Sequence, residues 1–220
     1  MSVELDHVFI LCAVDAPEAI ALTRLGLIEG PANTHPGQGT ACRRFLFRNA
    51  YVELLWVFDE REARSAAVRP TRLWERWSQR GQGACPFGVL LRPDGSTRAE
   101  QPPFPTWAYT PSYLPPGLAI DVAVDTPLNE PEFFYLGFRR GRVGSLHEPA
   151  AHAIAATAIT DVRIGMPMPG AQSMAARSAE AAGVLSFDVS SEYVLGLTLD
   201  GATTGTTADL RPDVPLVVHW

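Results

Sequence analysis

The stretches LDHVFI at residues 5–10 and YVELLWV at residues 51–57 decide the fold of this sequence. Both are rich in branched and aromatic residues, which is typical of β-strands. Each carries one side chain that is able to bind a metal, His7 in the first stretch and Glu53 in the second. Because a buried carboxylate without a partner is costly, Glu53 is expected to contact a cation, a hydrogen-bond donor or water. His7 and Glu53 can meet only if the two strands neighbour each other in one sheet.

The residues between these stretches predict one helix and two further strands. Residues 16–27 carry apolar residues at helical spacing and contain a glycine close to their end. Residues 27–32 and 40–47 are typical of strands, and the Pro/Gly-rich residues 33–39 between them predict a turn. The N-terminal part of the chain is therefore expected to form a βαβββ unit.

The alternation of side chains along a strand gives His7 and Glu53 a defined side. Side chains two residues apart share a face, so His7 lies on the face of Phe9, and Glu53 lies on the face of Tyr51. We expect both to face the concave side of the sheet with their tips about 4 Å apart or less, the span of two ligands of one ion. Two alternatives stay open: hydrogen-bonded positions at strand edges, and a structural ion pair between Glu53 and Arg43.

The βαβββ unit resembles the first module of the vicinal oxygen chelate superfamily, and more narrowly its glyoxalase-like proteins. The resemblance is carried by LDHVFI at residues 5–10, LGL at 25–27, HPGQGT at 35–40 and YVELL at 51–55. It implies an α+β fold in which paired βαβββ modules form curled, antiparallel-rich sheets around a half-open cup. Metal-using members bind a divalent ion through a first-strand His and a fourth-strand Glu of each module. His7 and Glu53 match one such half-set.

The end of the chain predicts the second module. Residues 159–166 resemble a first strand, a helix-like segment follows, and three strand candidates reach residue 220. We therefore expect a first module at 1–59, a bridging region with extra strands at 60–158 and a second module at 159–220. In an alignment of the two module sequences, Asp161 occupies the position equivalent to His7, and Leu216 or Val217 occupies the position equivalent to Glu53. The usual four-residue metal site is thus expected to be absent or remodelled.

Other candidate site residues have weaker patterns. His35 follows the predicted strand at 27–32 and is a candidate for acid/base catalysis or a third metal ligand, with a simple turn as the alternative. His147 and His152 are weak evidence for a metal site, because they are five residues apart outside a predicted helix. Four further side chains are candidates for a substrate pocket, with ordinary packing as the alternative for the aromatic ones: Arg43, Trp56, Trp107 and Tyr109.

The composition excludes several classes of protein. A net charge of −6 gives no basic footprint for nucleic acid or for an anionic membrane. All 18 basic residues are Arg, so lysine Schiff-base chemistry and a phosphate-loop lysine are excluded. The 3 cysteines lack a C-x-x-C spacing and fit a reducing compartment. Without a signal-peptide pattern or a long apolar run, we expect a soluble cytoplasmic protein.

Two functional hypotheses follow. The first is a metal-dependent enzyme of the lyase, isomerase or dioxygenase type that acts on a small oxygen-bearing substrate. His7 and Glu53 would hold a divalent ion (Zn, Mn, Fe or Ni), and Glu53 and His35 would be catalytic. The second is a metal-free protein of the same fold that binds or sequesters a small molecule. The expected partners are a substrate or ligand and, as an open alternative, a second copy of the chain in a homodimer.

Overall fold

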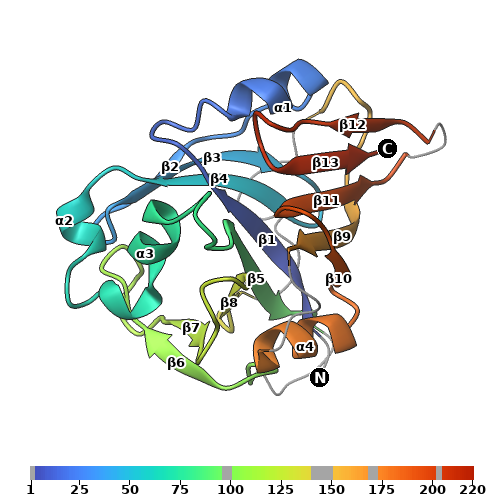
Figure 1. Ribbon diagram of the computed structural model, residues 1–220. Coiled ribbons are helices and arrows are strands. Elements are labelled where there is room, and N and C mark those ends of the chain that lie inside the picture. The colour runs from blue at the N-terminus through green and yellow to red at the C-terminus, as the bar shows by residue number, and fades with distance from the viewer. Residues whose placement is uncertain (1–2, 96–100, 140–150, 168–172, 202–204) are drawn as a thin grey trace.

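The computed structural model describes residues 3–95, 101–139, 151–167, 173–201 and 205–220. Its strands form an eight-stranded and a five-stranded sheet, and short helices lie beside them (Figure 1). The predicted α+β class with curled, antiparallel-rich sheets is confirmed.

Residues 3–57 form the predicted βαβββ unit. The first and fourth strands, β1 and β4, pair in parallel, and β3 and β2 continue the sheet beyond β4 through antiparallel pairs. The helix α1 makes the connection from β1, and a left-handed Gly26 with φ 101° ends it. The strand expected at residues 27–32 lies slightly later, at β2. The bounds are β1 Val3–Leu11, α1 Ala19–Leu25, β2 Asn33–His35, β3 Thr40–Leu46 and β4 Tyr51–Val57.

The second half of the eight-stranded sheet follows directly along the chain. β5 pairs with β1 in antiparallel orientation and with β8 in parallel, so β5-β8-β7-β6 repeats the order β1-β4-β3-β2 of the first half. Three short helical segments, α2, η1 and α3, connect the halves. The bounds are α2 Glu60–Ala63, η1 Arg69–Thr71, α3 Leu73–Ser78, β5 Phe87–Pro93, β6 Thr106–Tyr109, β7 Ile120–Ala123 and β8 Glu132–Tyr135.

The residues that form the second half of the cup differ from those expected from the sequence. The sequence predicts the second half of the cup at residues 159–220, whereas the structure takes it from residues 87–135. The pattern is hard to recognise because β6, β7 and β8 have only 4 residues each. In addition, the described residues between β5 and β6 contain no helix, so the βαβββ order is incomplete there.

Residues 159–220 form the five-stranded sheet in the order β10-β9-β11-β13-β12. The predicted strand–helix–strand order is present, with one additional short strand, β12. Apolar side chains of this sheet share one core with α1 and one face of the eight-stranded sheet, so the concave face of the larger sheet stays available (Figure 1). The bounds are β9 Ile159–Met166, α4 Met174–Ala181, β10 Ser186–Val189, β11 Val194–Leu199, β12 Thr207–Asp209 and β13 Leu216–His219.

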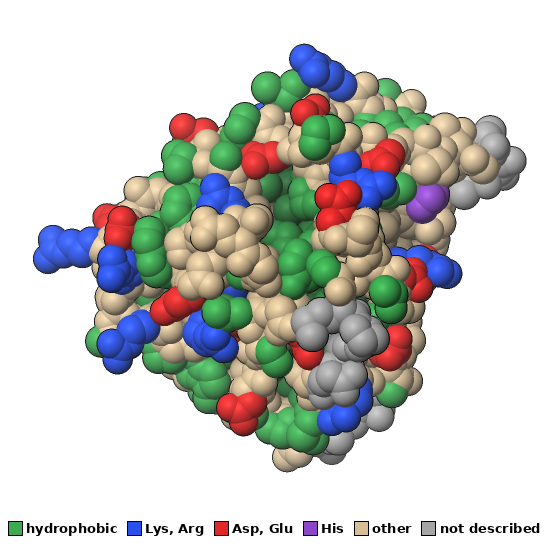
Figure 2. Space-filling view, in the orientation of Figure 1, with side chains coloured by type: hydrophobic (Ala, Val, Ile, Leu, Met, Phe, Trp, Pro, Cys, Tyr) green, Lys and Arg blue, Asp and Glu red, His purple; other side chains and the backbone are tan. Residues whose placement is uncertain are grey.

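The outer surface has mixed charge. Over the described residues that Figure 2 shows, Arg side chains are interspersed with Asp and Glu side chains and form no continuous basic patch. Among the described helices, none is long and apolar enough to cross a membrane. The expectation that nucleic acid is not a partner stays a prediction.

His152 attaches the segment before β9 to the first module. Its Nδ1 accepts a hydrogen bond from the backbone N–H of Ile28 over 3.0 Å, and its Nε2 donates to the carbonyl of Leu46 over 3.1 Å. The bond that Nδ1 accepts requires the neutral ring. Burial lowers the pKa of His152 below its ordinary value. The folded protein therefore favours the uncharged imidazole at this position.

We expect this contact to weaken in acid. Below about pH 6.5 the unfolded chain takes up a proton at His152 more readily than the folded protein, so the free energy of unfolding falls as the pH falls. A His152→Asn variant should cost about 1–3 kcal/mol near neutral pH, because it loses a buried hydrogen bond. Urea unfolding at about pH 7.5 and about pH 5.5 should show a smaller difference between wild type and variant in acid. A difference that does not change with pH would contradict the assignment.

Candidate functional site

A cavity of about 310 Å³ opens on the concave face of the eight-stranded sheet. This volume is at the lower end of the roughly 300–1,000 Å³ typical of small-molecule pockets. Strands of both halves line it, with His7, His35 and Glu53 on the first half. The cavity is therefore the site to which the sequence prediction points.

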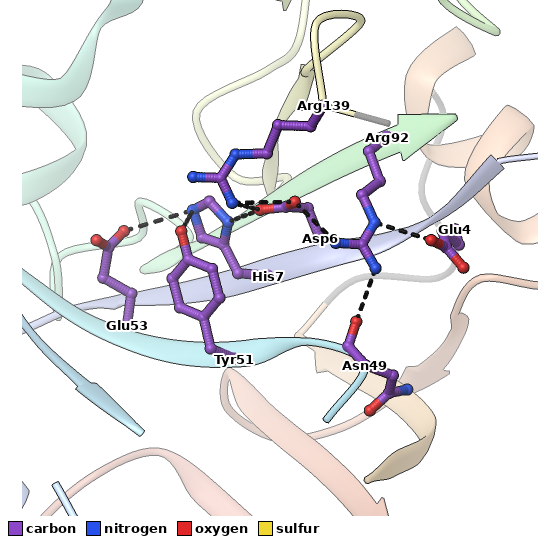
Figure 3. A network of polar contacts seen from close by, with 8 residues as sticks. All are labelled: Glu4, Asp6, His7, Asn49, Tyr51, Glu53, Arg92 and Arg139. Carbon is purple, nitrogen blue, oxygen red and sulfur yellow. Dashed lines mark hydrogen bonds and ion pairs between the residues drawn. The ribbon is translucent and has the colours of Figure 1, made fainter. Parts of the chain in front are cut away.

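His7 and Glu53 meet as predicted. In parallel register, His7 of β1 stands opposite Tyr51 of β4, and Glu53 lies two residues further along β4 on the same face. His7 Nε2 lies 3.6 Å from Glu53 Oε2, within the expected 4 Å (Figure 3). Arg43 is not the partner of Glu53, because it pairs with Glu29 instead.

A bulge in β1 adds Asp6 to this pair. The register between β1 and β5 shifts between Leu5 and His7. In a regular strand, neighbouring side chains point to opposite faces, and a bulge locally changes that direction. Asp6 is thereby able to contact its own neighbour: His7 Nδ1 donates to Asp6 Oδ1 over 2.6 Å. The imidazole thus lies between two carboxylates.

Tyr51 and two arginines hold this arrangement in place. The ring of Tyr51 stacks on the His7 ring with centroids 4.1 Å apart. Arg92 Nη1 donates to Asp6 Oδ2 over 3.3 Å, and Arg139 Nη1 lies 3.4 Å from both Asp6 oxygens. Figure 3 shows Tyr51 and Arg139 on opposite sides of the Asp6–His7 pair. The ring orientation of His7 is therefore fixed before any ligand arrives.

The protonation states follow from burial and partners. Burial disfavours the charged form of Glu53, but the hydrogen bond and charge of His7 lower the pKa of Glu53 to about 2. Burial also opposes charge on His7, whereas Asp6 and Glu53 raise its pKa above the ordinary value. Burial lowers the pKa of His35. Near neutral pH the site accordingly has an ionised Glu53 and a neutral His35.

A second cluster adjoins Glu53 on its other side. His35, Cys42 and Glu53 each offer one possible metal-ligand atom, and these atoms all lie within 4.8 Å of one another. His35 is fixed by its Nδ1 contact with Thr40 Oγ1 at 2.9 Å. Burial, followed by the charge of Glu53, raises the pKa of the Cys42 thiol. With His7 included, strands β1, β2 and β3 each contribute one donor side chain around Glu53 of β4.

The second half of the cup has no such donors at the equivalent positions. His7 pairs with Leu90 across the junction of the two halves. Leu90 in turn pairs with Phe134 as His7 pairs with Tyr51. Two residues beyond Phe134, Leu136 takes the place of Glu53. All three apolar residues line the cavity, so the second half of the sheet contributes apolar side chains where the first half contributes His7, Tyr51 and Glu53.

The remaining predicted pocket residues divide between the two faces. Tyr109 lines the cavity, and Trp107 packs edge-on against it with ring centroids 6.0 Å apart. Arg43 and Trp56 differ from the expectation, because both lie on the opposite face. They alternate along their strands with residues that line the cavity, Arg44 and Leu55. Applying the two-residue period to residues 40–46 and 51–57 would have shown this.

None of the described residues from 159 to 220 lines the cavity. Asp161 pairs with Arg163 on β9, and Leu216 is buried in the core while Val217 lies beside it on β13. His219 contacts Thr207 at the far end of β13. His152 holds two segments together, as described above, and His147 lies outside the described residues.

Sequence reasoning missed Asp6, Cys42, Arg44 and Arg139 as site residues. The bulge that turns Asp6 toward His7 has no sequence signal. Cys42 and Arg44 share a face of β3 that the register with β4 turns toward Glu53, so the period of the strand is a usable signal for these two. Arg139 follows β8 and reaches the site only through the tertiary fold.

Comparison with known proteins agrees with this geometry. Residues 5–105 match the sequence model of the glyoxalase-like domain family. Over these residues, somewhat under half of the chain, the sequence is similar to that family. The resemblance inferred from the strands around His7 and Glu53 is thereby confirmed over these residues. No curated protein matches the sequence.

Two solved structures resemble the whole chain or part of it. A hypothetical protein from Staphylococcus aureus aligns with a TM-score of 0.55 at 9% identity, covering 99% of this chain and 98% of that chain. A hypothetical protein from Bacillus halodurans aligns with a TM-score of 0.42 at 13% identity, covering 64% of this chain and 97% of that chain. At 9% identity the Staphylococcus aureus structure shows a similarity of fold alone, which extends over nearly the whole of both chains.

Proposed function

We propose that this protein is a metal-dependent enzyme that binds a divalent ion at Glu53 and acts on a small oxygen-bearing organic molecule. The observation that carries the proposal is the convergence of His7, His35 and Cys42 on Glu53 within four adjacent strands, with His7, His35 and Glu53 lining one cavity. Buried groups of this kind in a cavity mark functional sites more often than structural ones.

The donor set fits a metal ion. Imidazole, thiolate and carboxylate groups are the usual ligands of zinc and related ions. Asp6 receives the Nδ1 proton of His7 and leaves Nε2 directed toward Glu53, which is how a second-sphere carboxylate orients a metal-binding histidine. Glu53 has a lowered pKa and is ionised, as a ligand must be. The thiol of Cys42 favours Zn, Fe or Ni over Mn.

In this proposal, the bound ion, His35 and the residues around His7 have different roles. A bound divalent ion would supply Lewis-acid polarisation of a substrate oxygen. His35 stays neutral near pH 7 because burial lowers its pKa, so its ring can accept a proton when it does not serve as a ligand. Tyr51, Asp6 and Arg139 hold His7 in one orientation. Lyase, isomerase and dioxygenase reactions all use such a site.

One feature favours a second function, the binding of a small molecule without metal or turnover. The contacts of His7 with Asp6 and Glu53 are satisfied by the protein alone, and the wall formed by Leu90, Phe134 and Leu136 suits an apolar or aromatic ligand. In that case the protein would bind such ligands equally well after treatment with a chelator.

Metal titration separates the two functions. We expect calorimetry on chelator-treated protein to show one zinc ion per chain, bound roughly tenfold or more tighter than manganese because of the thiol and imidazole donors. His35→Ala should lower the zinc affinity at least about tenfold through the loss of one donor. His219→Ala is the matched control, since that histidine lies on β13 away from the cavity. Absence of zinc binding, with aromatic ligands still bound, would favour the second function.

A further inference from the structure

Two arginine side chains line the cavity beside the metal-ligand candidates, Arg44 of β3 and Arg139 beyond β8. Arg44 donates from Nε to the carbonyl of Pro31 over 2.8 Å, and Arg139 uses Nη1 for Asp6. Among the residues that the structure describes, the other guanidinium nitrogens of both side chains have no hydrogen-bond partner. Each arginine therefore has donors left for a ligand.

A third arginine, Arg92, differs from these two because all three of its guanidinium nitrogens donate hydrogen bonds within the protein. Arg92 is 0% exposed and donates to Glu4, to Asp6 and to the carbonyl of Asn49. Arg92 thus has a structural task, whereas Arg139 is 29% exposed at its side chain and Arg44 is only partly buried. The two lining arginines are accessible from the cavity.

The charge balance of the cavity favours an anion. The carboxylates Asp6 and Glu53 balance the guanidinium groups of Arg44 and Arg139 in number. A divalent ion bound by Glu53 and the thiolate of Cys42 would leave one positive charge uncompensated, in a cavity lined partly by apolar side chains, where charges interact more strongly than in water. The protein as a whole carries −6, so this local excess of positive charge is not a general property of its surface.

The shape of the cavity limits the rest of the ligand. Leu90, Phe134 and Leu136 line the cavity from the second half of the sheet, beginning with Leu90 directly beside His7. The volume of about 310 Å³ admits a small molecule only. A ligand that fills both halves needs a charged or polar end and an apolar end.

We propose that the substrate of this cavity is a small organic carboxylate, whose carboxylate group binds Arg44 and Arg139 and whose apolar part packs on Leu90 and Phe134. Planar guanidinium groups suit carboxylates because they donate two parallel hydrogen bonds to them. The inference rests on the proposed function, since it places this substrate beside the ion at Glu53. Beyond the proposed function, it specifies the chemical class of the substrate and assigns its selection to Arg44 and Arg139.

Binding of matched probes tests the inference. Hexanoate, hexanamide and hexyl phosphate share one apolar chain and differ in the head group. We expect calorimetry on the zinc-loaded protein to show hexanoate bound roughly tenfold or more tighter than hexanamide, the effect of a charge-assisted hydrogen-bond pair. Arg139→Gln and Arg44→Gln should each reduce the affinity for hexanoate by roughly tenfold and leave that for hexanamide unchanged.

Arg43→Gln is the control variant, because Arg43 is adjacent to Arg44 but lies on the opposite face, where it pairs with Glu29. Its affinity for hexanoate should equal that of wild type. Equal binding of hexanoate and hexanamide, an equal loss in Arg43→Gln, or a preference for hexyl phosphate would overturn the inference. Thermal unfolding of each variant shows that the fold is intact.

The same titrations on chelator-treated protein separate this inference from the proposed function. If zinc binds but the carboxylate preference is missing, the inference fails and the proposed function stands. If zinc does not bind while hexanoate is still preferred in an arginine-dependent way, the proposed function fails and carboxylate recognition stands.

Discussion

Replacing Arg76 by alanine is expected to lower the free energy of unfolding by about 3–5 kcal/mol, the cost of breaking a buried ion pair on one side. Arg76 lies on α3 and is 0% exposed. Its Nε donates to Glu132 Oε2 over 2.6 Å, and Nη1 donates to the carbonyl of Glu130 over 2.5 Å. Nη2 adds a bond of 3.0 Å to the carbonyl of Pro127. One guanidinium thus donates hydrogen bonds to backbone carbonyls of the turn before β8 and to the side chain of Glu132, the first residue of β8.

The variant leaves Glu132 buried without its cation. Burial already raises the pKa of Glu132, and the charge and hydrogen bond of Arg76, followed by the charge of Arg72, oppose this effect. Urea unfolding measures the loss. Arg64→Ala is the control, because Arg64 forms an exposed pair with Glu60, and such pairs contribute roughly 0–1 kcal/mol. A loss for Arg76→Ala no larger than that of the control would show that this arginine is not a structural anchor.

Glu53→Gln is expected to reduce zinc affinity by roughly 100-fold or more, since even residues that only support metal ligands contribute about 10–100-fold. The substitution keeps the size of the side chain and removes the one charge toward which His7, His35 and Cys42 converge. His7 keeps its bond to Asp6. Thermal midpoints of the metal-free proteins should therefore be similar, and catalytic activity should be lost with the metal.

Glu29→Gln provides the control for this variant. Glu29 pairs with Arg43 on the outer face, so its loss removes a carboxylate without touching the cavity. Its zinc affinity should equal that of wild type. A Glu53→Gln protein with unchanged zinc affinity and a strongly lowered thermal midpoint would show that Glu53 is a structural residue and that the site is assigned wrongly.

The fold of the first module is readable from sequence because its signals are local. The strands at residues 5–10 and 51–57 are long enough to show their two-residue period, and that period places His7 and Glu53 on one face. The 3.6 Å between their tips needed only one further assumption, that the two strands pair. Local pattern and tertiary pairing agree in this part of the chain.

The second half of the cup and part of the site depend on features without a local signal. β6, β7 and β8 are four residues long, too short for a period to be recognised. Residues 159–220 have the more complete pattern, so the sequence predicts them as the second half of the cup. The bulge at Asp6 and the approach of Arg139 arise from pairing between distant strands. Such contacts become visible only in three dimensions.

The central claim is that the donors around Glu53 hold a divalent ion. The most direct test is elemental analysis of the wild-type protein and of Glu53→Gln, both purified without chelator and then dialysed against a low concentration of zinc. We predict about one zinc ion per chain in the wild type, as expected for a single site with imidazole, thiolate and carboxylate donors, and nearly none in the variant. Wild-type protein that holds no zinc, or a variant that holds as much as the wild type, would contradict the claim.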